Sequence, residues 1–289
     1  MSHLSLRDLD IEYDVFGADL SPPLLLVMGL GYQMIEWEES LCTRLADRGF
    51  RVIRYDNRDV GLSTKLDAPG VPDILAVALG TAEPAYTLDE MADDGVALLD
   101  GLGIAAAHVV GVSMGGMIAQ LIAIRHPDRV LSLTSIMSTV GGPAVVQAEQ
   151  AVLENLLTPI GPTRDERIER SLATRRLING AGIPFDEERS RRQATLAVDR
   201  CFHPEGMLRQ LAAILAAPDR APALRKLEMP SLVIHGEADP LVPPENGRQT
   251  AAALRGARLM MIPGMGHNLP ERLWPDVVDA IVENTGARD

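Results

Sequence analysis

The chain has 289 residues, of which 46% are hydrophobic and 23% charged, a composition typical of a globular domain with a sizeable core. Its formal net charge of -13 argues against nucleic acid and anionic membrane surfaces as partners. No stretch approaches the roughly 18 consecutive apolar residues of a membrane span, and the first residues lack the apolar core of a signal peptide. We therefore expect a cytoplasmic protein that acts on a small molecule, and the oligomeric state stays open.

The two cysteines, Cys42 and Cys201, lie far apart and match no metal-binding spacing. Free thiols in a reducing compartment are the simplest expectation, although one disulfide stays open. The chain also lacks a Walker-type phosphate loop, a dinucleotide fingerprint and a Cys/His cluster. We therefore expect neither a cofactor nor a metal ion.

Predicted strands and helices alternate through the first half of the chain. Strands are expected at residues 11–16, 24–28, 50–55, 108–112 and 130–137. Helices are expected at residues 37–48, 88–99 and 117–126, the second opening with the capping box Thr87-Leu-Asp-Glu90. Continuous apolar runs such as residues 24–28 are typical of strands buried on both faces. The pattern predicts an α/β fold with a doubly wound, mostly parallel sheet.

The pattern changes between residues 141 and 220, where no convincing strand occurs and Ala, Leu, Arg and Glu dominate. This stretch predicts several helices, and its sign-alternating charges between Arg164 and Arg192 favour a solvated face. Strands resume at residues 231–235 and 257–262, and a last helix covers about 273–283. We therefore expect an α/β core at residues 1–140 and 221–289, with residues 141–220 inserted as a helical lid (cap). The glycines at 141 and 142, and the segment around Pro218 and Pro222, are candidate hinges.

The stretch His108-Val-Val-Gly-Val-Ser113-Met-Gly-Gly116 carries the first chemical indication. An apolar run leads into Gly-x-Ser-x-Gly, and an apolar helix follows. This is the strand–turn–helix context of a nucleophile elbow, in which glycines allow the strand and the helix to approach closely. Ser113 is therefore the candidate nucleophile, and the helix N-terminus behind it can stabilise an oxyanion.

A serine nucleophile needs a base, and the base needs a carboxylate that orients it. Asp239 lies in His235-Gly-Glu-Ala-Asp239, directly after one predicted strand, and His267 lies in Gly264-Met-Gly-His267, directly after the next. The order Ser113, Asp239, His267 is that of the α/β-hydrolase arrangement. We predict that these three residues form a catalytic triad, whereas His235 and Glu237 have structural or solvated roles.

These motifs resemble those of the α/β-hydrolase superfamily over nearly the whole length of the chain, with the weakest match in the lid. The residues that carry the resemblance are Gly111-Val-Ser113-Met-Gly115-Gly116, Tyr55-Asp56-Asn-Arg58-Asp-Val-Gly61-Leu-Ser63, His235-Gly-Glu-Ala-Asp239 and Gly264-Met-Gly266-His267. Within the superfamily, two stretches are most similar to the branch that contains aclacinomycin methylesterase: Val27-Met28-Gly29-Leu30-Gly31 and Asp56-Asn-Arg58-Asp-Val-Gly61. Many members carry His-Gly where this chain has Met28-Gly29, which removes a polar side chain beside the site.

The resemblance implies an oxyanion hole formed by the backbone N–H groups of Leu30 and Met114. Asp56 and Asp59, which flank Arg58, are expected to tie down a loop. We expect Trp37 in either the pocket wall or the core. The predicted substrate pocket comprises Gly29, Trp37, Leu156, Leu157, Phe185 and Leu211.

The sequence therefore predicts a serine hydrolase that cleaves carboxylic esters through an acyl-enzyme. A C–C bond hydrolase, a perhydrolase or a lactonase would use the same triad, and amide hydrolysis stays open. Haloalkane dehalogenases and epoxide hydrolases need an aspartate at the elbow, so Ser113 argues against both. A non-catalytic ligand-binding protein with the same fold is the alternative of another class, and turnover of a p-nitrophenyl ester separates it from an enzyme.

Overall fold

The computed structural model describes residues 2–6 and 9–286. In these residues, eight strands form one sheet in the order β1-β2-β4-β3-β5-β6-β7-β8. The strands are β1 (Ser2–Leu6), β2 (Leu9–Phe16), β3 (Pro23–Val27), β4 (Arg51–Tyr55), β5 (Ala107–Val112), β6 (Val130–Ile136), β7 (Ser231–Gly236) and β8 (Arg258–Ile262). The β1–β2 and β2–β4 pairs are antiparallel, and every pair from β4 to β8 is parallel.

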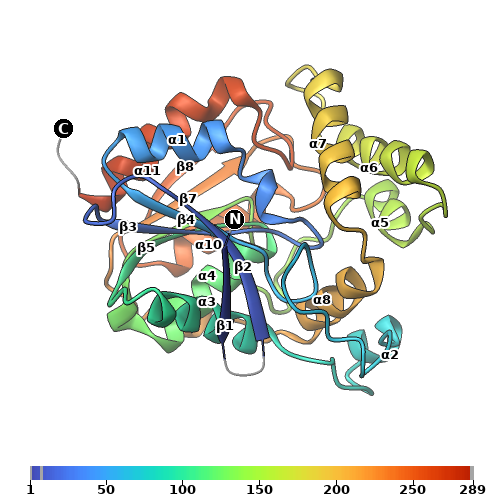
Figure 1. The fold of residues 1–289 in the computed structure, drawn as a ribbon, viewed down its shortest axis with the longest axis horizontal. Helices are drawn as coiled ribbons and strands as arrows, with labels where there is room; N and C mark the ends of the chain where they lie inside the picture. Colours follow the sequence, from blue (N-terminus) through green and yellow to red (C-terminus); the bar gives the residue numbers. More distant parts are fainter. Residues whose placement is uncertain (1, 7–8, 287–289) are drawn as a thin grey trace.

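Helices cover both faces of the sheet, which explains the continuous apolar runs in its central strands. Helices α1 and α11 lie on one face and α3 and α4 on the other (Figure 1). Strand β5 lies at the centre, where Val110 pairs with Leu26 of β3 and Thr134 of β6. The helices of the core are α1 (Glu39–Asp47), α2 (Ile74–Ala78), α3 (Leu88–Gly101), α4 (Met114–Arg125), α9 (Ala221–Leu224), α10 (Pro244–Ala253) and α11 (Trp274–Thr285), with 3-10 turns η1 (Met34–Glu36), η2 (Pro127–Arg129) and η3 (Glu271–Leu273).

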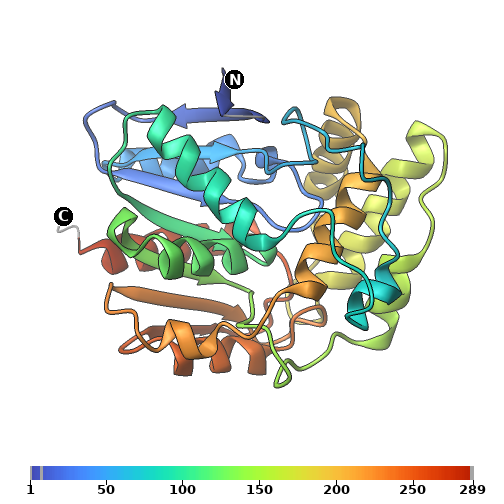
Figure 2. The ribbon, with the colours of Figure 1, turned by 90° about the horizontal axis from the view of Figure 1, so that it is seen from below.

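The insertion between β6 and β7 contains α5 (Gln150–Leu157), α6 (Arg164–Ile178), α7 (Glu187–Arg200) and α8 (Pro204–Ala216), and α9 follows it before β7. Helices α5 to α8 gather at one end of the sheet, to the right in Figure 2. The two ends of this insertion lie side by side, because Arg220 N donates to Val140 O over 2.9 Å. Gly141 and Gly142 have φ angles of 76° and 82°, a left-handed backbone that glycine adopts without strain. The candidate hinges thus adjoin one another.

The charges of the insertion fall into two sets. Arg164 pairs with Asp199 on the solvated surface, as expected from the alternating signs. Arg209, in contrast, crosses to the core and forms a bidentate pair with Asp59, and both side chains are buried. Other arginines of the insertion cross in the same way, Arg175 to Glu36, Arg189 to Glu38 and Arg200 to Asp56. The insertion is therefore joined to the core by charged hydrogen bonds as well as by apolar contacts.

The predicted α/β fold with a doubly wound, mostly parallel sheet is confirmed. The capping box is present at the start of α3, where Thr87 Oγ1 accepts from Glu90 N and Glu90 Oε2 accepts from Thr87 N. The sequence pattern did not predict the edge strand β1, the short helices α2 and α9, helix α10 or the 3-10 turns. None of the helices in the described ranges is long and apolar enough to cross a lipid bilayer.

Candidate active site

Ser113 occupies the turn between β5 and α4, with φ 55° and ψ -122°. A serine tolerates this sparsely populated backbone conformation only where the surrounding structure enforces it. The enforcement comes from hydrogen bonds on both sides of the residue. Ser113 N donates to Ile136 O at 2.9 Å, and Ser113 O accepts from Ser138 Oγ at 2.8 Å. The predicted strand–turn–helix around Ser113 is present.

Glycines let the turn close. A Cβ atom on Gly115 would overlap the carbonyl oxygen of Val27, and one on Gly111 would overlap the carbonyl oxygen of Gly115. Both obstacles are backbone atoms in the sheet or the helix, so neither could move aside. The two glycines therefore allow α4 to start directly against the strand ends.

Asp239 and His267 follow the ends of β7 and β8, and the structure brings them into contact. His267 Nδ1 lies 2.7 Å from Asp239 Oδ2, and both side chains are buried. Asp239 Oδ1 accepts from the N–H groups of Leu241 and Val242, at 2.9 and 2.8 Å. These bonds fix the carboxylate plane, so that one oxygen remains for the imidazole. Ser113, Asp239 and His267 thus all follow the carboxyl ends of parallel strands.

His235 lies beneath the acid and is completely buried. Its Nε2 is 2.7 Å from Val242 O and 3.6 Å from Asp239 Oδ2. Burial lowers the pKa of His235, while the Val242 carbonyl and Asp239 act in the opposite direction. The Val242 carbonyl accepts a hydrogen bond from Nε2–H, so we assign the neutral tautomer that carries its proton on Nε2. His235 thus supports the turn that carries Asp239.

The loop after β3 runs against the serine turn. A Cβ atom on Gly29 would lie 3.2 Å from the Cβ of Ser113, so only a glycine leaves normal spacing there. Asn57 Nδ2 donates to Met28 O at 2.9 Å, and Asp56 Oδ1 accepts from Met34 N at 2.7 Å. The 56–63 motif therefore ties down a loop, as expected, and the loop is the one that carries Leu30.

A second support of this loop was not predicted. Gln210, in helix α8 of the insertion, accepts a hydrogen bond from Gly31 N at 2.9 Å. The two residues are 179 positions apart, so no local pattern could have linked them. The only available indication was a glutamine among the apolar residues of a predicted helix.

The predicted substrate pocket is only partly described. Trp37 belongs to the core, packed with residues of β3 and α1, which is the second of its two expected locations. Phe185 is half-buried and lies under the guanidinium of Arg176, with 5.3 Å between the guanidinium carbon and the ring centroid. Leu156 and Leu211 are half-buried, and the side chain of Leu157 lies outside the described part of the chain.

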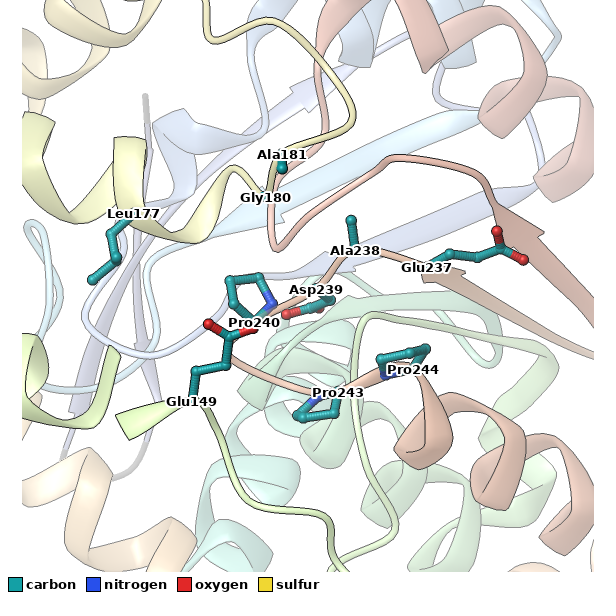
Figure 3. A pocket seen from close by; sticks show the side chains of 10 residues that line it. All are labelled: Glu149, Leu177, Gly180, Ala181, Glu237, Ala238, Asp239, Pro240, Pro243 and Pro244. Atoms are coloured by element: carbon teal, nitrogen blue, oxygen red, sulfur yellow. The ribbon is translucent and has the colours of Figure 1, made fainter. Parts of the chain in front are cut away.

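A pocket of about 530 Å³ opens beside Asp239, between the insertion and the loop after β7 (Figure 3). Among the residues described, its lining is Glu149, Leu177, Gly180, Ala181, Glu237, Ala238, Asp239, Pro240, Pro243 and Pro244. It includes none of the predicted pocket residues. This pocket therefore adjoins Asp239 and is not the predicted acyl pocket.

The described residues contain no group of three or more His, Cys, Asp or Glu side chains that could hold a metal ion. Cys42 and Cys201 are both free thiols, and burial raises the pKa of Cys42 to about 12. A buried thiol of this kind is not a nucleophile at neutral pH. The chemistry available at the strand ends is thus that of serine, imidazole, carboxylate and backbone N–H groups.

Comparison with known proteins identifies the family. Residues 22–168 match the model of the alpha/beta hydrolase fold family, and residues 212–278 match a family described as TAP-like protein. The chain is 32% identical to rhodomycin D methylesterase of Streptomyces peucetius, over 94% of this chain and 93% of the relative. It is 29% identical to 3-oxoadipate enol-lactonase 2 of Acinetobacter baylyi, over 85% of this chain and 82% of the relative.

Solved structures agree on the fold. The enol-lactonase from Burkholderia xenovorans LB400 superposes with a TM-score of 0.74 at 22% identity, covering 99% of this chain and 100% of that one. The meta-cleavage product hydrolase from Pseudomonas fluorescens IP01 superposes with a TM-score of 0.78 at 18% identity, covering 99% and 97%. The predicted resemblance is confirmed: the chain belongs to the α/β-hydrolase family and is similar over almost its whole length to methylesterases of that family.

Proposed function

We propose that this chain is a serine hydrolase that cleaves carboxylic esters, with Ser113 as nucleophile, His267 as base and Asp239 as the orienting acid. The observation that carries the proposal is the buried 2.7 Å contact between His267 and Asp239, combined with the left-handed backbone of Ser113 at a glycine-flanked turn. Similarity to two rhodomycin D methylesterases supports ester hydrolysis.

The reaction follows from the groups present. Ser113 Oγ attacks the ester carbonyl carbon while His267 Nε2 accepts the hydroxyl proton. Asp239, held by two backbone N–H groups, accepts from His267 Nδ1 and stabilises the imidazolium. The N–H groups of Leu30 and Met114 bind the oxyanion, and His267 then protonates the leaving alcohol. Water, activated by His267, hydrolyses the acyl-enzyme and regenerates Ser113.

The proposed substrate is a small-molecule ester, and a methyl ester is the first choice because the two methylesterase relatives align with almost the whole chain. The insertion, residues 141–220, acts as the lid that selects the acid portion of the ester. Its half-buried Leu156, Phe185 and Leu211 are the proposed acyl-pocket residues, together with Gly29. Two free thiols favour a cytoplasmic location.

The test is turnover of p-nitrophenyl acetate and of a panel of methyl esters by the wild type and by Ser113→Ala. We expect the variant to lose about 10³-fold or more in kcat, because the nucleophile is gone. Ser190→Ala, a change of the same size in helix α7, is the matched control and should retain activity. Labelling by a fluorophosphonate should require Ser113.

Two outcomes would contradict the proposal. Near-normal ester turnover by Ser113→Ala would show that the nucleophile is elsewhere. A wild type that binds esters but turns over none of the panel would indicate a binding protein. Faster turnover of lactones, of C–C substrates or of peroxide with an acid would assign the same triad to one of those reactions.

A further inference from the structure

Gln210 is completely buried and joins two loops of the core from helix α8 of the insertion. Its Oε1 accepts from Gly31 N at 2.9 Å, and its Nε2 donates to Arg58 O at 2.8 Å. The backbone N–H and C=O fix which end of the amide faces which loop, because an inverted amide would oppose donor to donor and acceptor to acceptor. The side chain is therefore a fixed bridge between the two loops.

Arg58, whose carbonyl accepts from Gln210 Nε2, is itself held in place. Arg58 Nε and Nη2 donate to the two carboxylate oxygens of Asp94, at 2.6 and 2.8 Å, and its side chain is 9% exposed. Asp94 belongs to α3, which packs against the sheet. A bidentate pair of this kind holds the guanidinium in one orientation. Arg58 O thus offers Gln210 a fixed acceptor.

The other end of the bridge lies directly beside the proposed oxyanion donor. Gly31 follows Leu30 and has a φ angle of 69°. A Cβ atom at this glycine would lie 2.7 Å from Met207 Cγ, so α8 presses on the loop one turn before Gln210. Met207 thereby sets the distance between helix and loop, and Gln210 sets the rotation of the Leu30–Gly31 peptide.

Other hydrogen bonds hold the far end of the loop: Gln33 Nε2 donates to Ala197 O and Cys201 O of the insertion, and Met34 N donates to Asp56 Oδ1. Within the turn, Tyr32 N donates to Gly29 O over 3.3 Å, a long bond. On the other side of Leu30, Asn57 holds Met28 O at 2.9 Å. Leu30 therefore lies between one support from the core and one from the insertion. Without Gln210, the Gly31 N–H would lose its acceptor and the Leu30–Gly31 peptide could rotate.

We propose that Gln210 is a positioning residue of the oxyanion hole: through Gly31 N it orients the peptide next to the Leu30 N–H. This inference rests on the proposed function, in which Leu30 N–H binds the oxyanion. Its consequence is that the helical insertion supplies part of the catalytic apparatus in addition to covering the substrate. Oriented N–H donors act in the transition state, so the effect should appear in kcat rather than in KM.

The first experiment compares Gln210→Ala with Gln120→Ala in ester hydrolysis. Gln120 is equally buried and makes two side-chain hydrogen bonds, to Arg220 Nε and Ser135 Oγ, but it belongs to α4 and those bonds do not reach the 29–34 loop. We expect Gln210→Ala to lose about 10- to 100-fold in kcat with KM within about twofold, less than the loss of an oxyanion donor itself. Gln120→Ala should lose similar thermal stability and keep its kcat.

The same pair is then titrated with a trifluoromethyl ketone, which forms a tetrahedral adduct with a nucleophilic serine. Affinity for this inhibitor should fall in Gln210→Ala by about the factor lost in kcat, because the adduct carries the oxyanion. A kcat of Gln210→Ala within twofold of the wild type, or an equal loss in Gln120→Ala, would overturn the inference. An inactive wild type would instead overturn the proposed function.

Gln210→Glu supplies a readout that a purely structural role would not move. The ionised carboxylate still accepts from Gly31 N but opposes Arg58 O, whereas the protonated carboxyl restores both hydrogen bonds. Burial raises the pKa of such a carboxyl toward neutrality. The ratio of variant to wild-type kcat should therefore rise as the pH falls from about 8 to about 5. A ratio that stays flat over this range would contradict the inference.

Discussion

The turn that carries Ser113 and the loops that carry Leu30 and His267 are supported in different ways. Ser113 is held by the core alone, through Ile136 O and Ser138 Oγ. His267 N, in contrast, donates to Ile178 O of the insertion at 2.7 Å, and Gly31 N donates to Gln210 of the insertion. The proposed nucleophile thus belongs to the sheet, whereas the proposed base and oxyanion donor depend on both regions.

The contact between the insertion and the base is backbone against backbone. A Cβ atom on Gly266 would overlap the carbonyl oxygen of Asn179, and one on Gly182 would overlap the Cα of Gly264. Asn268 Nδ2 also donates to Asn179 Oδ1 at 2.6 Å. Such close packing leaves the segment 178–182 little freedom to move away from the His267 loop. If the insertion acts as the proposed lid, it should therefore open through its other helices while this segment stays in place.

The prediction with the largest expected effect tests how the sheet supports the turn that carries Ser113. Gly115→Ala places a methyl group on the carbonyl oxygen of Val27, where only backbone is available to yield. We expect a loss of about 3 kcal/mol or more in unfolding free energy, together with loss of ester turnover. Urea unfolding followed by circular dichroism measures the first, and p-nitrophenyl acetate hydrolysis the second.

Gly256→Ala is the matched control, because its φ is 72° but nothing lies within 4 Å of the added Cβ atom. It should cost only the left-handed backbone term, about 1 kcal/mol, with activity retained. Equal stability losses in the two variants would show that the close approach of α4 to the sheet does not constrain the fold.

The sequence predicted the sheet side of the site better than the insertion side, and the reason is physical. Ser113, Asp239 and His267 each follow an apolar strand directly, so a local motif shows both the residue type and its place at the strand end. Gln210 and Arg209 contact residues 179 and 150 positions away. The local sequence of their helix does not indicate which distant residues they contact. Their roles become visible only when the insertion is packed on the core.

The charges of the insertion make the same point. The pattern between Arg164 and Arg192 correctly predicted surface pairs such as Arg164 with Asp199. It could not show that Arg175 and Arg189 turn inward to Glu36 and Glu38, because alternating signs do not encode the direction of a side chain. Helices α2 and α10 were not predicted either, because each begins in a short Pro-containing segment, which locally favours a turn.

A second prediction separates the two sets of charges. Arg209→Ala leaves Asp59 buried without its bidentate partner, and removal of one member of a buried pair is strongly destabilising. We expect a loss of about 3 kcal/mol, at the lower end for such pairs, because the adjoining Asp67 is 65% exposed and admits water. Urea unfolding measures this loss.

Arg164→Ala is the control within the same insertion. Its side chain is 53% exposed and pairs with Asp199 at the surface, where water and salt screen the charges, so the unfolding midpoint should hardly change. If the two variants lost equal stability, the inward arginines would not join the insertion to the core more strongly than surface pairs do.

The smallest effect is a pH dependence that originates in the sheet. Burial lowers the pKa of His108 in β5 and that of His235 in β7 below the ordinary value of 6.5. Below about pH 6.5 the unfolded chain therefore binds protons that the native sheet excludes, so stability falls with falling pH, by at most about 1.4 kcal/mol per pH unit for each histidine. Urea midpoints at several pH values between about 7.5 and 5 measure this slope.

His108→Gln should flatten the slope, because glutamine keeps a polar contact with Ser132 Oγ, now 2.9 Å from His108 Nδ1, and does not titrate. The Asp59–Arg209 ion pair between core and insertion changes the stability of the wild type in a different pH range. Burial alone would raise the pKa of Asp59, but hydrogen bonds from Arg209 and Leu66 N–H outweigh burial and hold that pKa below its usual 3.8. Its contribution is present above that value and is lost only as the pH falls through the lowered pKa. Arg209→Ala removes the hydrogen bonds that lower this pKa most, so burial should raise the pKa of Asp59 in the variant. The variant's stability deficit relative to the wild type should therefore shrink as the pH falls from about 7.5 to about 5, and a constant deficit would show that Asp59 stays ionised without Arg209.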